Sequence, residues 1–255
     1  MKKVLIIGRP EGASELLWAN KINLLDAVKS FAEDMNEAAK AIINLGAEPL
    51  AFTPVASYHI YPTMHFPYLD KRIKIVSDKD IYEMIDEINA VVLIGMTAKA
   101  GTLHAFMDSS YNWVGFHDYI INDKVCGEIG LYKTYFSHFG TPIAFVTGDE
   151  AACKEAESEL KGVKTLTVKQ ATCRNKAVKI EGAKERIAAI CEEALLNFPI
   201  RKKEERVPLT IKIVYNRTEF CDDSVRWHRN TVERIDDRTL QKTINEVKYI
   251  YDLIF

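Results

Sequence analysis

The sequence predicts an α/β fold, with a mostly parallel sheet flanked by helices and a small C-terminal α+β subdomain packed on that sheet. Short continuous apolar runs such as Val4–Ile7 and Ala90–Gly95 have the length and composition of strands that are buried on both faces. Between such runs, apolar residues recur with helical spacing. Strands that alternate with helices in this way are typical of a parallel sheet covered on both sides.

The elements expected before Met96 follow from local patterns. Leu24–Leu45 is expected to be a helix because its apolar residues recur at helical spacing and Gly46 follows where a helix end favours glycine. Asp78–Ile88 is expected to be a helix with Ser77 or Asp78 as its N-cap. The other expected elements are strands over 4–7, 49–53, 72–76 and 90–95 and an ordered aromatic loop over 57–70.

The elements expected after Gly101 continue the alternation. Gly127–Phe139 is expected to be a helix that Gly140 ends, and Asp149 is expected to cap a helix over 150–160. The other expected elements are strands over 119–122, 141–147, 165–169 and 208–215, a helix over 183–197 and a final amphipathic helix over 240–253. We expect a single domain over residues 1–255, with a core over 1–200, a charged linker over 201–206 and the subdomain over 207–255.

The composition narrows the class of protein. The 255 residues carry a net charge of -2, so nothing favours nucleic acid, which would call for a basic face. No stretch has the length of a membrane span, and the N-terminal apolar run is too short for a secretory signal. The five cysteines are odd in number and form no CxxC pair, which is typical of reduced thiols. We therefore expect a cytoplasmic protein with no membrane and no nucleic-acid partner.

Polar side chains gather where the predicted strands end. In an open α/β sheet, ligands bind beyond the carboxyl ends of the strands, so these residues form a candidate site. They are Arg9 and Glu11 after the first strand, Thr97, Lys99 and Thr102 after the strand at 90–95, Asp149 and Glu150 after the strand at 141–147, and Glu128 at a helix start.

Each of these residues also has a structural interpretation. Glu11 can be a first-turn carboxylate that interacts with a helix dipole, and Arg9 can be a solvated loop charge. Asp149 is expected to be a helix cap rather than one of a catalytic pair. Glu128 lies among small and apolar residues, so we expect it to be buried and to need a partner, either in a structural ion pair or as a functional acid.

The sequence lacks the common motifs of nucleotide-binding proteins, metallopeptidases and serine hydrolases. It contains no GxGxxG, GxxxxGK[ST], HExxH or GxSxG pattern. Its six histidines form no metal-ligand doublet, and a lone histidine is more often a packing residue than a metal ligand.

Several segments do carry a family resemblance. RPEG stands where the family has D-x-E-G, and IGMTAKAGT matches its G-[YF]-H-A-x-A-G-T. The most specific region, Gly127 to Lys176, includes GEIGLY, GTPIAFVTGDEAACKEA and TLTVKQATCRNKAV, and VERIDDRTL matches the last strand of the family. On these segments the chain resembles the DppA-type D-aminopeptidases, a family of cytoplasmic zinc peptidases.

The resemblance implies an α/β fold, ring-shaped homo-oligomers and a dinuclear zinc site that removes D-amino acids from short peptides. Two carboxylate ligands of that site are kept, as Glu11 and Glu128. The other positions differ from the family: Arg9 stands where the family has an aspartate ligand, and Thr97 stands where it has a histidine. A second histidine position of the family falls near Ala56, and His59 is close to it in sequence. Asp108 aligns loosely with the histidine to which the family assigns a catalytic role.

The arginine at a former ligand position suggests a physical replacement for metal. Two zinc ions bring positive charge that lets several carboxylates lie together, and without it the carboxylates repel or take up protons. Arg9 is therefore expected to pair with Glu11, Glu128 or both. Because a guanidinium cannot convert water to hydroxide as zinc does, we expect no cofactor, although zinc stays possible.

The first interpretation of function is a diverged enzyme with amide- or peptide-type chemistry on a small amino-acid or peptide-like molecule. Its expected acid–base groups are Glu11, Glu128 and Asp108, while Arg9 and Lys99 would hold a carboxylate or stabilise an oxyanion. The expected substrate-binding residues are Lys99, Thr97, Thr102, His104 and Cys126, with His104 or His117 as possible bases and Cys126 as a possible nucleophile.

Two other interpretations remain open at this point. In one, the protein is a non-catalytic binding or assembly protein in which Arg9 fills a dead site, still as a ring-shaped homo-oligomer. In the other, Glu11, Glu128 and a histidine from 59–65 or 104–117 bind a single zinc ion with an open position. The ligand expected in each case is a small molecule or a short peptide.

Overall fold

The main sheet of the computed structural model has seven strands, and the structure describes residues 2–19, 24–54, 64–198, 203, 207–228 and 230–255. The strand order is β3-β2-β1-β4-β7-β8-β9, and all neighbours are parallel except β8 and β9. The strands are β1 (Lys3–Gly8), β2 (Glu48–Phe52), β3 (Lys74–Ile75), β4 (Ile88–Met96), β7 (Ile143–Asp149), β8 (Lys164–Cys173) and β9 (Lys176–Lys179).

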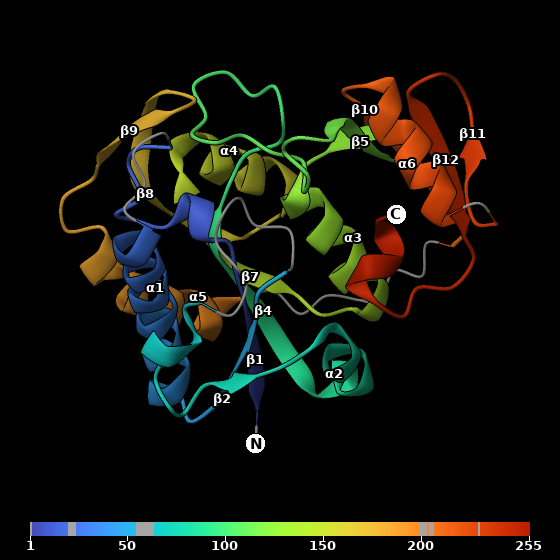
Figure 1. Cartoon of the computed structure of the whole chain (residues 1–255). Coiled ribbons are helices and arrows are strands. Elements are labelled where there is room, and N and C mark those ends of the chain that lie inside the picture. The colour runs from blue at the N-terminus through green and yellow to red at the C-terminus, as the bar shows by residue number, and fades with distance from the viewer. Residues whose placement is uncertain (1, 20–23, 55–63, 199–202, 204–206, 229) are drawn as a thin grey trace.

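Helices cover both faces of this sheet, which confirms the predicted fold class (Figure 1). One face packs against α1 (Leu24–Asn44) and α5 (Ile187–Asn197). The other face packs against α2 (Asp78–Glu83), α3 (Glu128–Phe139) and α4 (Glu150–Glu159). Because both faces are covered, β1, β4 and β7 are buried along nearly their whole length, as their continuous apolar runs predicted.

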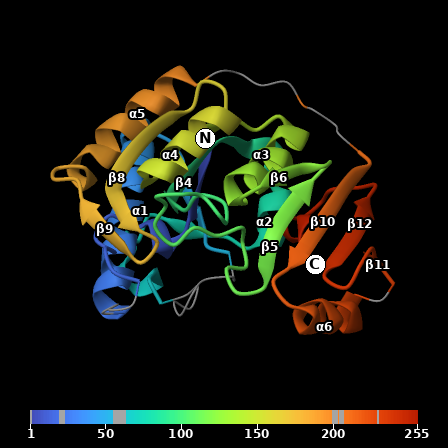
Figure 2. The same cartoon turned by 90° about the horizontal axis from the view of Figure 1, so that it is seen from above.

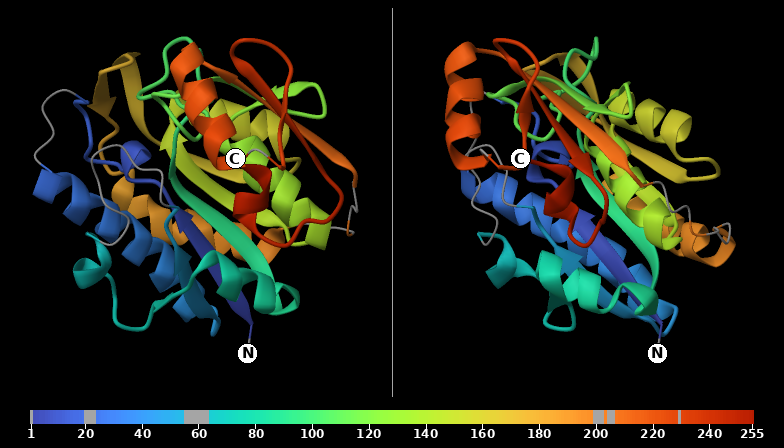
Figure 3. Two further views of the ribbon diagram at one scale, coloured as in Figure 1. Left: turned by 45° about the vertical axis from the view of Figure 1, so that its right-hand side comes forward. Right: turned by 90° about the vertical axis from the view of Figure 1, so that its right-hand side faces the viewer.

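A second, antiparallel sheet of five strands lies beside α3, in the order β11-β12-β10-β5-β6 (Figures 2 and 3). The strands are β5 (Phe116–Ile121), β6 (Lys124–Cys126), β10 (Leu209–Tyr215), β11 (Glu233–Arg234) and β12 (Thr239–Ile244), and α6 (Thr218–His228) connects β10 to the β11–β12 hairpin. The C-terminal segment therefore shares one sheet with strands from the middle of the chain.

The predicted helix over 240–253 is wrong. Residues Thr239–Ile244 form β12, and only Ile250–Leu253 are helical, as the short 3-10 turn η5. The physical reason is tertiary pairing: β12 lies in register with β10 from Thr239 opposite Val214 to Ile244 opposite Leu209. The apolar spacing that suggested a helix instead comes from Val247, Ile250 and Leu253, which are buried in the core beside α3.

Short-range signals located several other boundaries correctly. Gly140 ends α3 with a left-handed φ of 77°. Ser77 caps α2 in a capping box with Asp80, and the Asp149 side chain accepts a hydrogen bond from the amide of Ala152 at the start of α4. The predicted helix over 78–88 is shorter than expected, since α2 ends at Glu83 and a 3-10 turn, η3 (Ile85–Glu87), follows it.

In the part of the chain that the structure describes, no helix combines the length and apolar character needed to cross a membrane. Residues 57–63 of the predicted aromatic loop and most of the predicted linker over 201–206 lie outside the described residues.

Candidate functional site

The site begins where β1 meets β4, at the turn that carries Arg9 and Glu11. The Arg9 amide donates a hydrogen bond to the Ile94 carbonyl at 2.8 Å, and residues Pro10–Gly12 form the 3-10 turn η1. A Cβ on Gly12 would lie only 2.1 Å from the Gly95 carbonyl oxygen. The turn therefore packs directly on the β4 backbone, and glycine at position 12 permits this close approach.

Three predicted site residues meet at this turn. Nη2 of Arg9 lies 2.8 Å from Oε1 of Glu128, and Nε of Arg9 lies 3.6 Å from Oε2 of Glu11. The exposed fractions of Arg9, Glu11 and Glu128 are 1%, 4% and 1%. The ion pairs expected from the sequence are thus present and shielded from water, and we call these three residues the Arg9 cluster.

Burial and charge act in opposite directions on the Arg9 cluster. Burial alone would lower the pKa of Arg9, but the Glu11 and Glu128 carboxylates reverse that effect and hold it above its ordinary value. Burial raises the pKa of Glu128 to about 7, an effect that Arg9 opposes and Glu11 reinforces. A single guanidinium therefore only partly compensates the burial of two carboxylates.

Two tyrosines border the Arg9 cluster. Burial raises the pKa of the Tyr111 and Tyr132 phenols, and the nearby Glu128 carboxylate raises both further. Neither Oε2 of Glu128 nor the hydroxyl of Tyr132 has a hydrogen-bond partner among the described residues. The cluster thus presents buried polar atoms that can still accept or donate a hydrogen bond.

Lys99, Thr102 and His104 lie together in a different place. They line an open pocket of about 590 Å³ between the loop after β4 and helix α4, whose wall includes Glu150 and Glu155. The Lys99 amide donates to the Glu155 carboxylate at 2.7 Å, and the Thr102 hydroxyl donates to the Lys99 carbonyl at 2.7 Å.

This pocket borders the helix that carries Glu128. A Cβ on Gly127 would lie 2.8 Å from Cβ of Lys99, so the Lys99 loop packs against the start of α3. Six of the predicted site residues are therefore divided between the buried Arg9 cluster and an adjacent open pocket.

Asp108 and Asp149 have fixed partners of their own. One Asp108 oxygen lies 2.9 Å from Nε of Arg174, and the other accepts from the Gly101 amide at 2.7 Å. Asp149 accepts hydrogen bonds from the amides of Ala152 and Phe106. It therefore caps helix α4 and also holds the loop that carries Phe106. Thr97 is buried directly after β4, and its hydroxyl has no hydrogen-bond partner among the described residues.

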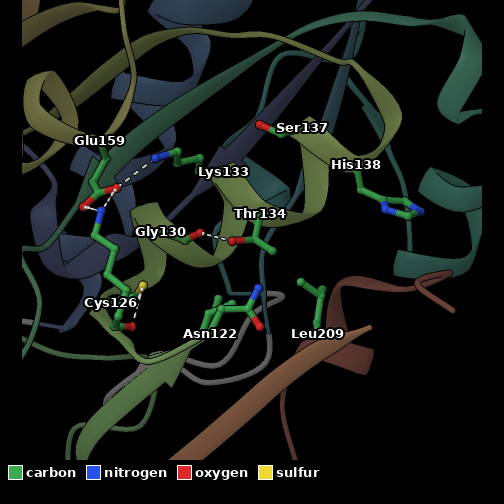
Figure 4. A pocket seen from close by; sticks show the side chains of 11 residues that line it. Asn122, Cys126, Gly130, Lys133, Thr134, Ser137, His138, Glu159 and Leu209 are labelled. Carbon is green, nitrogen blue, oxygen red and sulfur yellow. Dashed lines mark hydrogen bonds and ion pairs between the residues drawn. The ribbon is translucent and has the colours of Figure 1, made fainter. Parts of the chain in front are cut away.

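Cys126 faces a separate small pocket of about 200 Å³ beside β6 and α3 (Figure 4). Its Sγ lies 3.2 Å from the Lys124 carbonyl oxygen, and burial raises the pKa of the thiol. The same pocket contains Glu159, which pairs with Lys124 and Lys133 (Figure 4). The raised pKa keeps the thiol protonated, which is unfavourable for a nucleophile.

The histidines considered as ligands lie in unrelated surroundings. His65 is buried against the rings of Phe31 and Phe66, and its Nε2 lies 3.1 Å from the Thr53 hydroxyl. Burial lowers the pKa of His65 to about 4, so it is a neutral packing residue. His104 is exposed in the open pocket, and His117 is exposed beside Asp118, whereas Ala56 and His59 lie outside the described residues.

Comparison with known proteins gives the same fold and family. A solved structure described as the Zn-dependent D-aminopeptidase DppA from Bacillus subtilis, a self-compartmentalizing protease, superposes with a TM-score of 0.81, covering 98% of this chain and 94% of that chain at 20% identity. A curated D-aminopeptidase of Bacillus subtilis (strain 168) is 30% identical over 125 residues, which span 49% of this chain and 44% of that relative. The model of peptidase family M55, D-aminopeptidase, matches residues 20–255. The chain belongs to the D-aminopeptidase family.

Within this D-aminopeptidase family member, the expected metal positions that the structure describes hold a cation, Arg9, beside Glu11 and Glu128. The guanidinium of Arg9 already lies beside both retained carboxylates, and a divalent cation there would face a fixed positive charge. Among the residues that the structure describes, no three His, Cys, Asp or Glu side chains are placed to hold a metal ion together.

Sequence reasoning missed several buried polar residues of this family member. Asp34 lies on α1 within the apolar stripe that includes Phe31 and Met35, and that position was a visible signal of burial. Lys169 follows the buried Leu166 and Val168 of β8 and is itself fully buried. Tyr132 gave no comparable signal, because a tyrosine in an amphipathic helix is common in any core.

Proposed function

We propose that this D-aminopeptidase family member acts on a small amino-acid or peptide-like molecule, with amide- or peptide-type chemistry, at a site without the dinuclear zinc that the family resemblance implies. The observation that carries the proposal is the 2.8 Å ion pair between Arg9 and Glu128, with Glu11 on the other side of the guanidinium. Arg9 takes the role of the fixed positive charge that metal would otherwise supply to these carboxylates.

Two members of the Arg9 cluster, Glu128 and Arg9, and the nearby Lys99 have chemical parts in this proposal. Glu128 is the acid–base group, because proton exchange is most efficient when the pKa of the group lies near the working pH. The guanidinium of Arg9 stabilises negative charge that develops on a carbonyl oxygen. Lys99, in the adjacent open pocket, binds the carboxylate of the substrate. As in the self-compartmentalizing relative, we propose a homo-oligomer.

A second candidate function is a non-catalytic binding or assembly protein on the same scaffold. The observation in its favour is the burial of Arg9, Glu11 and Glu128, since three charged side chains closed off from water can serve as a structural ion cluster. In that case the open pocket with Lys99 and His104 would bind a ligand, and the Arg9 cluster would take no part in turnover.

Metal content of the protein purified without chelator is the first test. The proposal expects close to no zinc per chain by elemental analysis. One or two zinc ions per chain would contradict it, and D-amino-acid peptides would then be the first substrates to assay. A chelator-treated and zinc-reloaded sample serves as the control for weakly held metal.

The Arg9→Asp variant separates the two candidate functions once an activity or a ligand is found. Turnover that depends on the Arg9 cluster should fall sharply in Arg9→Asp, while Lys99→Ala should chiefly raise KM. Ligand binding without turnover in both wild type and Arg9→Asp would support the non-catalytic alternative. Unchanged turnover in Arg9→Asp would remove Arg9 from the mechanism.

A further inference from the structure

Lys169, on strand β8, is a fully buried lysine that contacts the main chain of residues 11–16, the segment that carries Glu11. Its Nζ donates hydrogen bonds to three main-chain carbonyl oxygens, of Glu11 at 2.9 Å, Ala13 at 2.8 Å and Leu16 at 2.9 Å. An ammonium has three donors, so these three acceptors use all of them. The amine also lies 4.3 Å from the centre of the Phe106 ring, which adds a cation–π contact.

The convergence of three carbonyls from one short segment distinguishes Lys169 from an ordinary buried ion pair. Its closest acceptors are neutral main-chain oxygens of residues 11–16, and charged Asp149, Asp34 and Glu11 act on it only at longer range. Without the amine, three carbonyl oxygens would point at one another in a region closed to water.

The same segment has two further anchors. The Asp34 carboxylate accepts from the amide and the hydroxyl of Ser14, both at 2.7 Å. The Glu15 amide donates to the Ser30 hydroxyl at 3.1 Å, so α1 also holds the segment from its other side. Of these three anchors, Lys169 is the one that reaches the Glu11 end, where its contact atom is the carbonyl of the residue that faces Arg9.

We propose that Lys169 is a positioning residue that fixes the main chain of residues 11–16 and so holds the Glu11 carboxylate against Arg9. Its three hydrogen bonds fix the main chain at Glu11, Ala13 and Leu16. The Glu11 side chain is therefore attached to main chain that is held in place. This role concerns the geometry of the Arg9 cluster, and it holds whether or not the cluster takes part in turnover.

The wild-type protein provides the first test, by NMR of its lysine ammonium groups at a pH of about 6, below the pKa of about 7 that burial gives Lys169. We expect one ammonium signal that is protected from exchange with water and shows couplings across hydrogen bonds to the carbonyl carbons of Glu11, Ala13 and Leu16. The signal should vanish in Lys169→Met. Absence of any such protected signal from the wild type would overturn the proposal.

A pair of variants then separates positioning from general stability. Lys169→Met removes the donors at similar length, and Val168→Ala removes buried volume from the neighbouring residue of β8. We expect amide hydrogen exchange of Ser14, Glu15 and Leu16 to accelerate about tenfold or more relative to the sheet in Lys169→Met only. The Arg9 Nε–H signal should shift or broaden in Lys169→Met and persist in Val168→Ala. Equal effects of the two variants on both readouts would show a merely structural role and overturn the proposal.

Discussion

The guanidinium of Arg9 lies 2.8 Å from the carboxylate of Glu128, and both side chains are almost completely buried. Arg9 follows the first strand, and Glu128 opens a helix in the middle of the chain, so the pair joins two distant parts of the fold. A buried pair of this kind adds little stability over an apolar replacement, whereas loss of one partner leaves an uncompensated charge. That asymmetry determines how variants of the cluster should behave.

Arg9→Gln should lower the free energy of unfolding by about 3–5 kcal/mol, because Glu11 and Glu128 then lose the guanidinium that pairs with both of them in a closed region. Arg226→Gln is the control, since its ion pair with Asp223 is exposed and should be of little consequence. The free energy of unfolding of both variants can be measured by urea denaturation. An Arg9→Gln protein as stable as the control would contradict the structural account of the cluster.

The double variant Arg9→Gln/Glu128→Gln should recover part of the stability that Arg9→Gln loses, because it removes the uncompensated carboxylate together with the guanidinium. The coupling energy from the resulting double-mutant cycle should be about 1–3 kcal/mol. A coupling energy close to zero would mean that the side chains of Arg9 and Glu128 do not interact in solution.

The stability of the wild type should depend on pH through Glu128. Its pKa in the folded state, about 7, lies above the ordinary value of 4.5, so the folded protein holds a proton that the unfolded chain releases. Stability from this group is therefore present below about pH 4.5 and lost as the pH rises towards about 7. Denaturation curves at several pH values should show that the wild type loses stability over this window relative to Glu128→Gln. A parallel pH dependence of the two proteins would refute the assignment.

Gly12→Ala should be much more destabilising than Gly182→Ala. A methyl group on Gly12 would lie 2.1 Å from the Gly95 carbonyl oxygen, and main chain on both sides cannot move away cheaply. Gly182 has a left-handed φ of 71° but open space around it, so its alanine variant should lose only about 1–2 kcal/mol. The melting temperatures of the two variants can be compared by thermal unfolding. Similar melting temperatures would show that the turn is not packed on β4 as described.

Asp34→Ala should cost about 1–3 kcal/mol, because it leaves the buried amide and hydroxyl of Ser14 without their acceptor. Asp118→Ala is a suitable control, since Asp118 pairs with the exposed His117. Denaturation should show the difference, and Ser14→Ala should be milder because it removes only the hydroxyl. Equal stability of Asp34→Ala and Asp118→Ala would exclude Asp34 as an anchor of the segment.

The parts of the site that sequence reasoning predicted are those that follow directly from strand ends. Arg9 and Glu11 come immediately after β1, and the apolar surroundings of Glu128 correctly indicated a buried carboxylate that needs a partner. The role of Lys169 could not be predicted, because its three acceptors are main-chain oxygens brought to it only by tertiary folding. For the same reason local spacing misassigned residues 240–253, where pairing with β10 overrides helical periodicity.

The shared antiparallel sheet makes completion of the site depend on the end of the chain. β6 leads within two residues into α3 at Glu128, and β5, its partner, pairs on its other edge with β10. During synthesis, all three residues of the Arg9 cluster are therefore complete before β10 and β12, which complete the sheet next to α3, have been made. Until β10 emerges, the edge of β5 with which β10 pairs is open, next to the strand that leads into Glu128.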